Sequence, residues 1–181
     1  MLTTRSTKRT GREHFAWDFR VDILEGETEL GQLTIDRKTG GGALTLEGAN
    51  YAFTHARGIG LGETPLEIIV RWILKKPKPP PDHYELRDAT GRVLATADQM
   101  REVFAITCEA GRFRFAKGPT LLLFALTTEG EPAPLGTVGQ RKRLTQTMEM
   151  DLPKRISRPI QAFLLALLLT LIAQRSANAS T

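Results

Sequence analysis

The segment that most limits the possible folds of this chain is an uncharged, almost wholly apolar run near its end, QAFLLALLLTLIA at Gln161–Ala173. A helix that is apolar on every side must be surrounded by protein or by lipid. The uninterrupted apolar part, Ala162–Ala173, would extend about 18 Å as a helix, whereas a bilayer core needs roughly 20 apolar residues. We therefore expect a helix over residues 158–174 that is buried inside the protein.

The ends and the packing face of this helix can also be predicted. Ser157 is a suitable N-cap, and Pro159 fits the first turn, where its missing N–H is not needed. The large apolar side chains of the segment are expected to fill the centre of the structure. These central-helix residues are Phe163, Leu164, Leu167, Leu168 and Leu171.

The chain before this segment has the pattern of short antiparallel strands. In AWDFRVDIL, starting at Ala16, apolar and charged residues alternate, which is typical of a strand with one buried face. Glycines in RKTGGG, Arg37–Gly42, favour a hairpin turn between two such segments. Further strands are expected at residues 30–35, 43–46, 50–56, 66–74, 84–88, 93–97, 103–107, 112–116, 121–127, 135–138 and 145–150. A mainly β fold follows, with about twelve strands in a closed antiparallel barrel around the C-terminal hydrophobic helix, because closure leaves no exposed sheet edge.

One domain accounts for most of the chain. Lys75–Pro81, KKPKPPP, cannot join a sheet ladder, and we interpret it as a proline-rich loop within one barrel over residues 15–175. A linker between two domains, or a proline-rich ligand for an SH3-type groove, is the alternative. Residues 1–14 are expected to be a disordered basic tail, and residues 176–181 a second disordered tail.

The net charge does not indicate a nucleic-acid-binding body. The chain carries 25 basic and 20 acidic residues, but four of the basic ones lie in residues 1–12, which leaves 21 basic against 20 acidic residues elsewhere. A nucleic-acid-binding domain should have a basic footprint of its own. Cys108 is the only cysteine, so no intrachain disulfide can form, and we expect a cytoplasmic protein.

Two segments resemble a known superfamily. ELRDATGRVLATADQ, Glu85–Gln99, is similar to a hairpin of the LURP-one-related and phospholipid-scramblase-like branch of the tubby C-terminal superfamily, and PIQAFLLALLLTLIAQ, Pro159–Gln174, resembles its central helix. The resemblance implies a twelve-stranded barrel threaded by that helix. Members include phosphoinositide-binding tubby proteins and membrane-associated scramblases. The cysteine-rich segment and the acidic calcium loop of scramblases have no counterpart here, since only Glu149 and Asp151 lie close upstream of the helix.

The sequence contains no recognisable combination of catalytic or metal-ligating residues. The three histidines, His14, His55 and His83, lie far apart without a recurring metal-ligand spacing. His55 is expected to be a structural residue, and Cys108 a small buried one. The glycine spacing of HARGIGLGETP, His55–Pro65, precedes an expected strand rather than a helix, so it does not fit a phosphate-binding loop. We expect no enzyme, no metal and no cofactor.

Six basic residues near the helix are the best candidates for a binding site. They give a local charge of +4 against Glu149 and Asp151, and each basic side chain near an anionic leaflet can contribute about 1 kcal/mol. These candidates are Arg141, Lys142, Arg143, Lys154, Arg155 and Arg158. A solvated surface without a ligand is the alternative reading.

The sequence thus predicts a non-enzymatic, intracellular binding module of the tubby-like type. Its expected ligand is an anionic lipid headgroup, which would place it at the periphery of a membrane, or a protein partner. The alternative is a scramblase-like protein anchored in a membrane through residues 158–174, with a cytoplasmic β domain.

Overall fold

We analysed a computed structural model of the chain, which describes residues 1–6, 18–36, 39–56, 81–118, 123–140 and 147–178. Several sequence predictions fall outside these ranges. The expected strand over residues 66–74, most of the proline-rich loop 75–81 and the basic triplet Arg141–Arg143 are among them.

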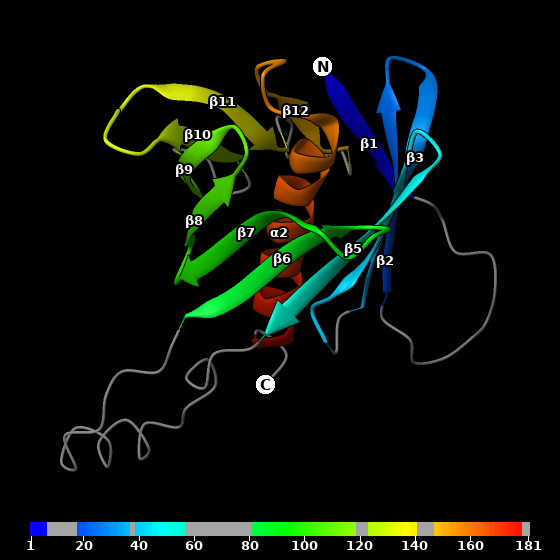
Figure 1. Cartoon of the computed structure of the whole chain (residues 1–181), viewed down its shortest axis with the longest axis horizontal. Coiled ribbons are helices and arrows are strands. Elements are labelled where there is room, and N and C mark those ends of the chain that lie inside the picture. Colours follow the sequence, from blue (N-terminus) through cyan, green and yellow to red (C-terminus); the bar gives the residue numbers. More distant parts are fainter. Residues whose placement is uncertain (7–17, 37–38, 57–80, 119–122, 141–146, 179–181) are drawn as a thin grey trace, which may run out of the picture.

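Twelve strands form a closed antiparallel barrel, as the alternating pattern predicted (Figure 1). Each strand pairs with its neighbour in sequence, and β1 closes the ring by pairing with both β2 and β12. The strands are β1 (Leu2–Ser6), β2 (Asp18–Glu25), β3 (Thr28–Asp36), β4 (Gly42–Leu46), β5 (Ala49–Ala56), β6 (Asp82–Asp88), β7 (Val93–Met100), β8 (Val103–Cys108), β9 (Gly111–Lys117), β10 (Leu123–Thr128), β11 (Pro134–Gly139) and β12 (Glu149–Asp151).

The closing strand β1 corrects one prediction. Residues 1–14 were expected to be disordered, but Leu2–Ser6 form β1, so this prediction is wrong for these five residues. Leu2 and Thr4 are almost fully buried, as alternate residues on the inner face of a strand should be. The Thr4 N–H donates to the Met148 carbonyl at 2.9 Å, and the Met148 N–H donates to Thr4 Oγ1 at 3.0 Å. Strand pairing and the burial of Leu2 and Thr4 stabilise an ordered strand here, although the basic, hydroxyl-rich composition of the segment favours disorder.

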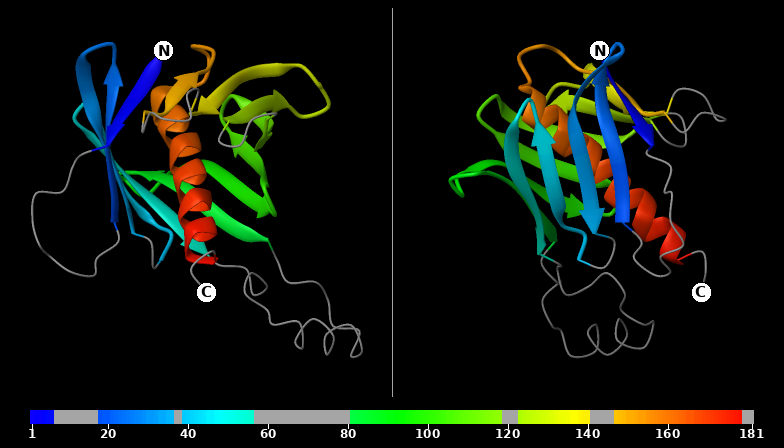
Figure 2. Two further views of the ribbon diagram at one scale, coloured as in Figure 1. Left: turned by 180° about the vertical axis from the view of Figure 1, so that it is seen from behind. Right: turned by 90° about the vertical axis from the view of Figure 1, so that its right-hand side faces the viewer.

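The helix α2 (Arg158–Asn178) passes through the barrel, with its start beside β12 (Figures 1 and 2). Of the predicted central residues, Phe163, Leu164, Leu167 and Leu168 are at most 1% exposed, and Leu171 is 6% exposed. The prediction of a buried central helix is therefore confirmed. The helix continues beyond residue 174, so the expected disordered tail 176–181 is wrong for residues 176–178.

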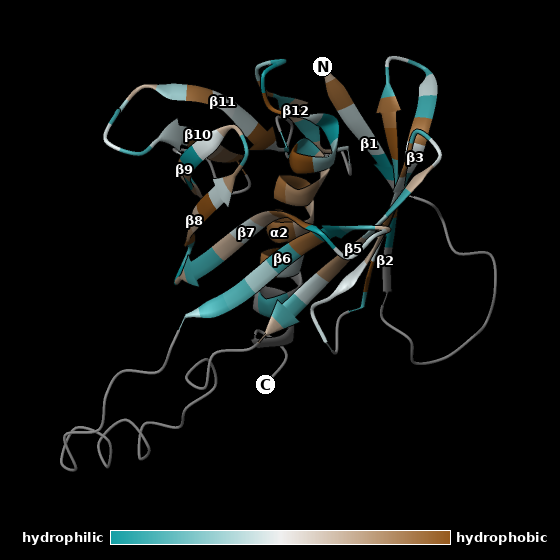
Figure 3. Ribbon diagram, in the orientation of Figure 1, coloured by the Kyte–Doolittle hydropathy of each residue, from teal (hydrophilic) through white to brown (hydrophobic). Residues whose placement is uncertain are grey.

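A belt of aromatic side chains lines one side of the barrel interior against the helix. Consecutive rings in this belt have centroids 5.2 to 6.2 Å apart. Its members are Phe53 on β5, Tyr84 on β6, Phe104 on β8, Phe115 on β9 and Phe124 on β10. Phe53 also meets Phe163 of α2 edge to face at 5.7 Å. Much of α2 is coloured hydrophobic in Figure 3, as expected of a helix that serves as the core of a barrel.

Among the described residues, no helix combines the length and the apolar character that crossing a membrane requires.

Candidate functional site

The turn between β12 and α2 carries two of the predicted basic residues. Lys154 and Arg155 are both exposed there, and neither forms an ion pair with another described residue. Arg141, Lys142 and Arg143 belong to the connection between β11 and β12, outside the described ranges. The structure therefore leaves at least two cations of the cluster open to an anionic ligand.

Arg158 is in a different position, because two carboxylates already neutralise it. Its Nη2 atom lies 2.6 Å from Glu25 Oε2, and its Nη1 atom contacts Glu47 Oε1. Glu25 ends β2 and Glu47 lies in the turn between β4 and β5, so the first residue of α2 is held against two separate hairpins. A basic residue at a helix N-terminus opposes the helix dipole, and these two carboxylates offset that effect. We interpret Arg158 as a residue that fixes the helix start.

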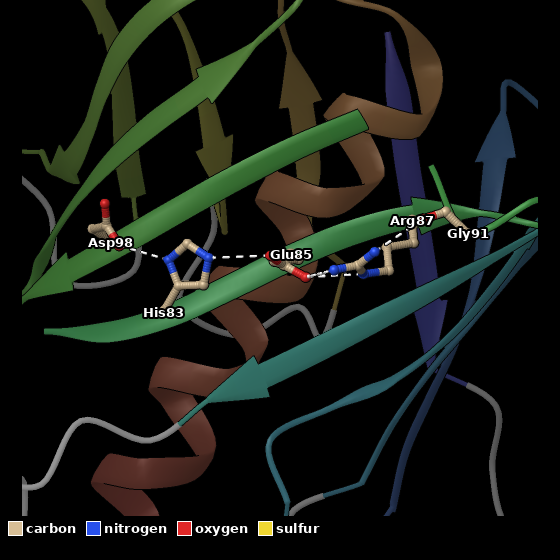
Figure 4. Close-up of polar contacts among 5 residues, drawn as sticks. All are labelled: His83, Glu85, Arg87, Gly91 and Asp98. Carbon is tan, nitrogen blue, oxygen red and sulfur yellow. Dashed lines mark hydrogen bonds and ion pairs between the residues drawn. The ribbon is translucent and has the colours of Figure 1, made fainter. Parts of the chain in front are cut away.

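The outer face of β6 and β7 carries a ladder of charges (Figure 4). His83 Nδ1 lies 2.7 Å from Asp98 Oδ1, and its Nε2 lies 3.4 Å from Glu85 Oε1. Arg87 donates to Glu85 Oε2 from Nε at 2.9 Å and from Nη2 at 2.6 Å, and its Nη1 donates to the Gly91 carbonyl at 2.9 Å. The alternation of HYELR places His83, Glu85 and Arg87 on one face of β6.

This outer ladder shifts the protonation of its members. The hydrogen bond to Asp98 raises the pKa of His83, despite partial burial, and Glu85 adds to the effect. The hydrogen bond from Arg87 lowers the pKa of Glu85. The charges neutralise one another across two strands, so the outer ladder stabilises the β6–β7 pairing rather than presenting a free charge to a ligand.

A second polar cluster lies inside the barrel, where β5 ends and β6 begins. Its centre is His55, whose side chain is only 2% exposed, as is that of Asp82. His55 Nδ1 lies 2.8 Å from the Thr39 carbonyl oxygen, and Nε2 lies 3.3 Å from Asp82 Oδ2. The ring of Tyr84 stacks on the imidazole with centroids 4.4 Å apart.

Neutral polar groups extend this cluster to the helix. The Tyr84 hydroxyl donates to Gln99 Oε1 at 2.8 Å, and Gln99 Nε2 donates to the Arg101 carbonyl at 2.8 Å. Gln174 of α2 donates to the Tyr84 hydroxyl at 3.3 Å. The sequence analysis predicted a structural role for His55 but did not single out Asp82 or Gln99. Near the end of a strand, the sequence pattern does not distinguish a polar residue that faces inward from one that faces outward.

The outer surface of β8, β9 and β10 is hollowed by a groove of about 690 Å³. Its lining mixes apolar side chains, among them Met100 and Val103, with the exposed Arg112 and Arg114. Cys108 lies outside this groove and is half-buried, and burial raises the pKa of its thiol. Since the thiolate is the reactive form, this cysteine is a poor nucleophile.

Comparisons with protein-family models, with curated proteins and with solved structures found no match. The class of the protein is therefore defined by its architecture, a closed twelve-stranded antiparallel barrel with a buried C-terminal helix. The resemblance to the tubby C-terminal superfamily stays a prediction.

Proposed function

We propose that this chain is a non-enzymatic binding module of the tubby-like type that recognises anionic lipid headgroups through the basic cluster beside the start of α2. The observation that carries the proposal is the exposure of Lys154 and Arg155, which have no carboxylate partner among the described residues. Arg141, Lys142 and Arg143 precede β12 in sequence and lie outside the described residues, so their part in the site is a prediction from the sequence.

The arrangement of the core favours binding at the outer surface over chemistry in an interior site. Leu164, Leu167 and Leu168 of α2 lie where a hollow barrel would hold a small molecule. Ligand recognition by such a filled barrel relies on its loops and its outer face. The turn from Leu152 to Ser157, which joins β12 to α2, is anchored by the buried Ile156 and by the Gln161 side chain, which donates to the Ile156 carbonyl at 2.8 Å.

The expected interaction is weak and sensitive to salt. Each basic residue near an anionic leaflet contributes about 1 kcal/mol to the binding free energy. Lys154 and Arg155 alone would therefore bind a membrane only marginally. Binding would be clearly detectable if Arg141, Lys142 and Arg143 contributed as well. At about 0.1 M salt the screening length is about 10 Å. Only basic side chains within about that distance of the membrane surface are then attracted to it.

Co-sedimentation with vesicles tests the proposal. We expect the full chain to pellet with phosphatidylcholine vesicles that contain phosphatidylserine, to stay in solution with phosphatidylcholine alone, and to lose binding as salt rises. The double variant Lys154→Gln/Arg155→Gln should bind several-fold more weakly, and the triple variant Arg141→Gln/Lys142→Gln/Arg143→Gln should do the same.

A matched control removes the same charge from elsewhere on the barrel. Arg112→Gln/Arg114→Gln changes two exposed cations on β9 and should leave vesicle binding nearly unchanged. Equal losses in the β9 variant and the Lys154/Arg155 variant would show that net charge alone drives binding. Absence of binding to any anionic vesicle would contradict the lipid proposal and direct attention to a protein partner.

A further inference from the structure

We propose that the groove on the outer face of β8, β9 and β10, at the left of Figure 1, is a docking site for an extended acidic segment of a partner protein. This groove is separate from the lipid site, which lies beside the start of α2. Three features of the groove support this occupant: exposed apolar side chains, two cations that form no ion pair among the described residues, and a spacing of groups set by the strands.

Apolar side chains gather in the groove although it faces outward. Among the described residues, three large apolar side chains are exposed, namely Met1, Val93 and Met100. Met100 is 64% exposed and lines the groove, and Val93 lines a smaller hollow of about 290 Å³ that shares Thr107 with it. Val103 pairs with Met100 across β7 and β8 and lines the groove too. Outward positions of a sheet that faces water are usually polar, so this apolar surface indicates a face that a partner covers.

Two arginines of β9 line the same groove. Phe113 between them is buried, so Arg112 and Arg114 lie on the outer face of the strand. Both are exposed, and neither forms an ion pair with another described residue. Opposite Arg114 lie Ala105 of β8 and Thr127 of β10, which carry no charge. The guanidinium of Arg114 can therefore bind a carboxylate of a ligand through two parallel hydrogen bonds.

Acidic residues of this chain determine where in the groove a negative ligand binds best. Glu129 and Glu131, in the turn after β10, also line the groove, and the Glu129 N–H donates to the Arg112 carbonyl at 3.2 Å. Asp98 of β7 is two strands away from Arg114 and is already paired with a histidine of the outer ladder. The attraction for a carboxylate is therefore strongest at Arg114, and the two glutamates weaken it at Arg112.

The order of these groups along β9 defines the chemistry of the occupant. Arg112 and Arg114 are separated by two residues of one strand, about 6.7 Å, which is also the distance between alternate side chains of an extended peptide. Val103 pairs with Ala116, two residues beyond Arg114, so the apolar end of the groove follows the cations at the same spacing. A matching segment carries carboxylates at two alternate positions and an apolar side chain at the next alternate position.

The position of the groove favours a peptide over a small amphiphile such as a fatty acid. Small ligands bind where most of their surface is buried, whereas this groove lies on the outside of a barrel whose interior is filled by α2. An alkyl chain in the groove would stay largely in contact with water. A segment of a partner protein can make further contacts beyond the groove, so a shallow site is sufficient for it.

Fluorescence anisotropy of a labelled synthetic peptide, titrated with the full chain, tests the proposal. The peptide has blocked ends, aspartate at its second and fourth positions, leucine at its sixth and threonine elsewhere. We expect saturable binding that Arg112→Gln/Arg114→Gln weakens at least about threefold, through the loss of two exposed ion pairs. Met100→Ser should weaken binding by removing apolar contact, and Glu129→Gln/Glu131→Gln should strengthen it by removing repulsion.

The variant Lys154→Gln/Arg155→Gln is the matched control, because it removes two exposed cations from the proposed lipid site. It should weaken vesicle binding and leave peptide binding unchanged, whereas Arg112→Gln/Arg114→Gln should do the reverse, so the two proposals can fail separately. Equal loss of peptide binding in both double variants would overturn the groove proposal. Equal binding of a peptide with lysine in place of both aspartates, displacement of the peptide by octanoate, or no saturable binding would overturn it as well.

Discussion

At the scale of single residues, Gly40 shows how a turn and a buried side chain depend on each other. Gly40 has φ +73° and lies against the imidazole of His55, so an added Cβ would collide with that ring. We expect Gly40→Ala to lower the free energy of unfolding by about 2–3 kcal/mol, from backbone strain and steric overlap together.

Two other glycines provide the control for this substitution. Gly26 and Gly48 have φ +64° and φ +79°, but an added Cβ at either would meet no atom within 4 Å. Gly26→Ala and Gly48→Ala should therefore show only the backbone strain, about 1 kcal/mol. Equal losses at all three positions in urea unfolding would contradict the packing of Gly40 on His55.

His83, in the outer ladder, makes a distinct contribution that depends on pH. Because Asp98 raises its pKa in the folded state, its stabilising effect is complete below about pH 6.5 and is lost as the pH rises through the folded-state value. The His83 side chain is 38% exposed, so we expect less than about 1 kcal/mol. His83→Gln should therefore destabilise the protein at about pH 5.5 and hardly at all at about pH 8.5, in thermal unfolding. A larger effect at the higher pH would refute this assignment.

Single polar residues were the hardest feature to predict from the sequence. The positions of Lys154, Arg155 and Arg158 next to the helix could be predicted, because they adjoin it in the chain. The pairing of Arg158 with Glu25 and Glu47 could not, since those partners lie 133 and 111 residues away. Contacts of this kind depend on the register of distant hairpins, which local patterns do not specify.

At the scale of elements, α2 carries the largest testable effect. Leu167 is fully buried near the middle of the helix. Leu167→Asp would place a carboxylate in an apolar interior at a cost of at least about 4 kcal/mol, which is comparable to the whole stability of many domains. We expect this variant to be unfolded by circular dichroism, whereas Leu167→Met, which conserves volume, should lose less than about 1.5 kcal/mol. A folded Leu167→Asp protein of unchanged thermal stability would refute the central position of the helix.

Elements with a strong periodic pattern were predicted well, and those without one were not. Alternation identified β5, β6 and β9 within a few residues, because each has one apolar and one polar face. The first strand, β1, was missed because LTTRS contains only one bulky apolar residue. Its strand conformation depends on β2 and β12, which lie on either side of it.

At the scale of the whole molecule, the order of the chain constrains how the barrel forms. The helix at its centre is the last element in sequence, and the closing pair joins β1 to β12. Neither the core nor the closed ring can be complete until the C-terminal segment is in place. We therefore expect cooperative unfolding, in which the helix and the strands around it lose structure together.

Hydrogen exchange of the backbone amides measures whether the apolar C-terminal helix is the core of the closed barrel. Amides from Phe163 to Leu171 should exchange only through global unfolding, at the same slow rate as inner residues of β6 and β9. Mass spectrometry of the full chain measures both sets in one experiment. Exchange of the helix well ahead of the strands would show that it lies outside the cooperative core and would contradict the account.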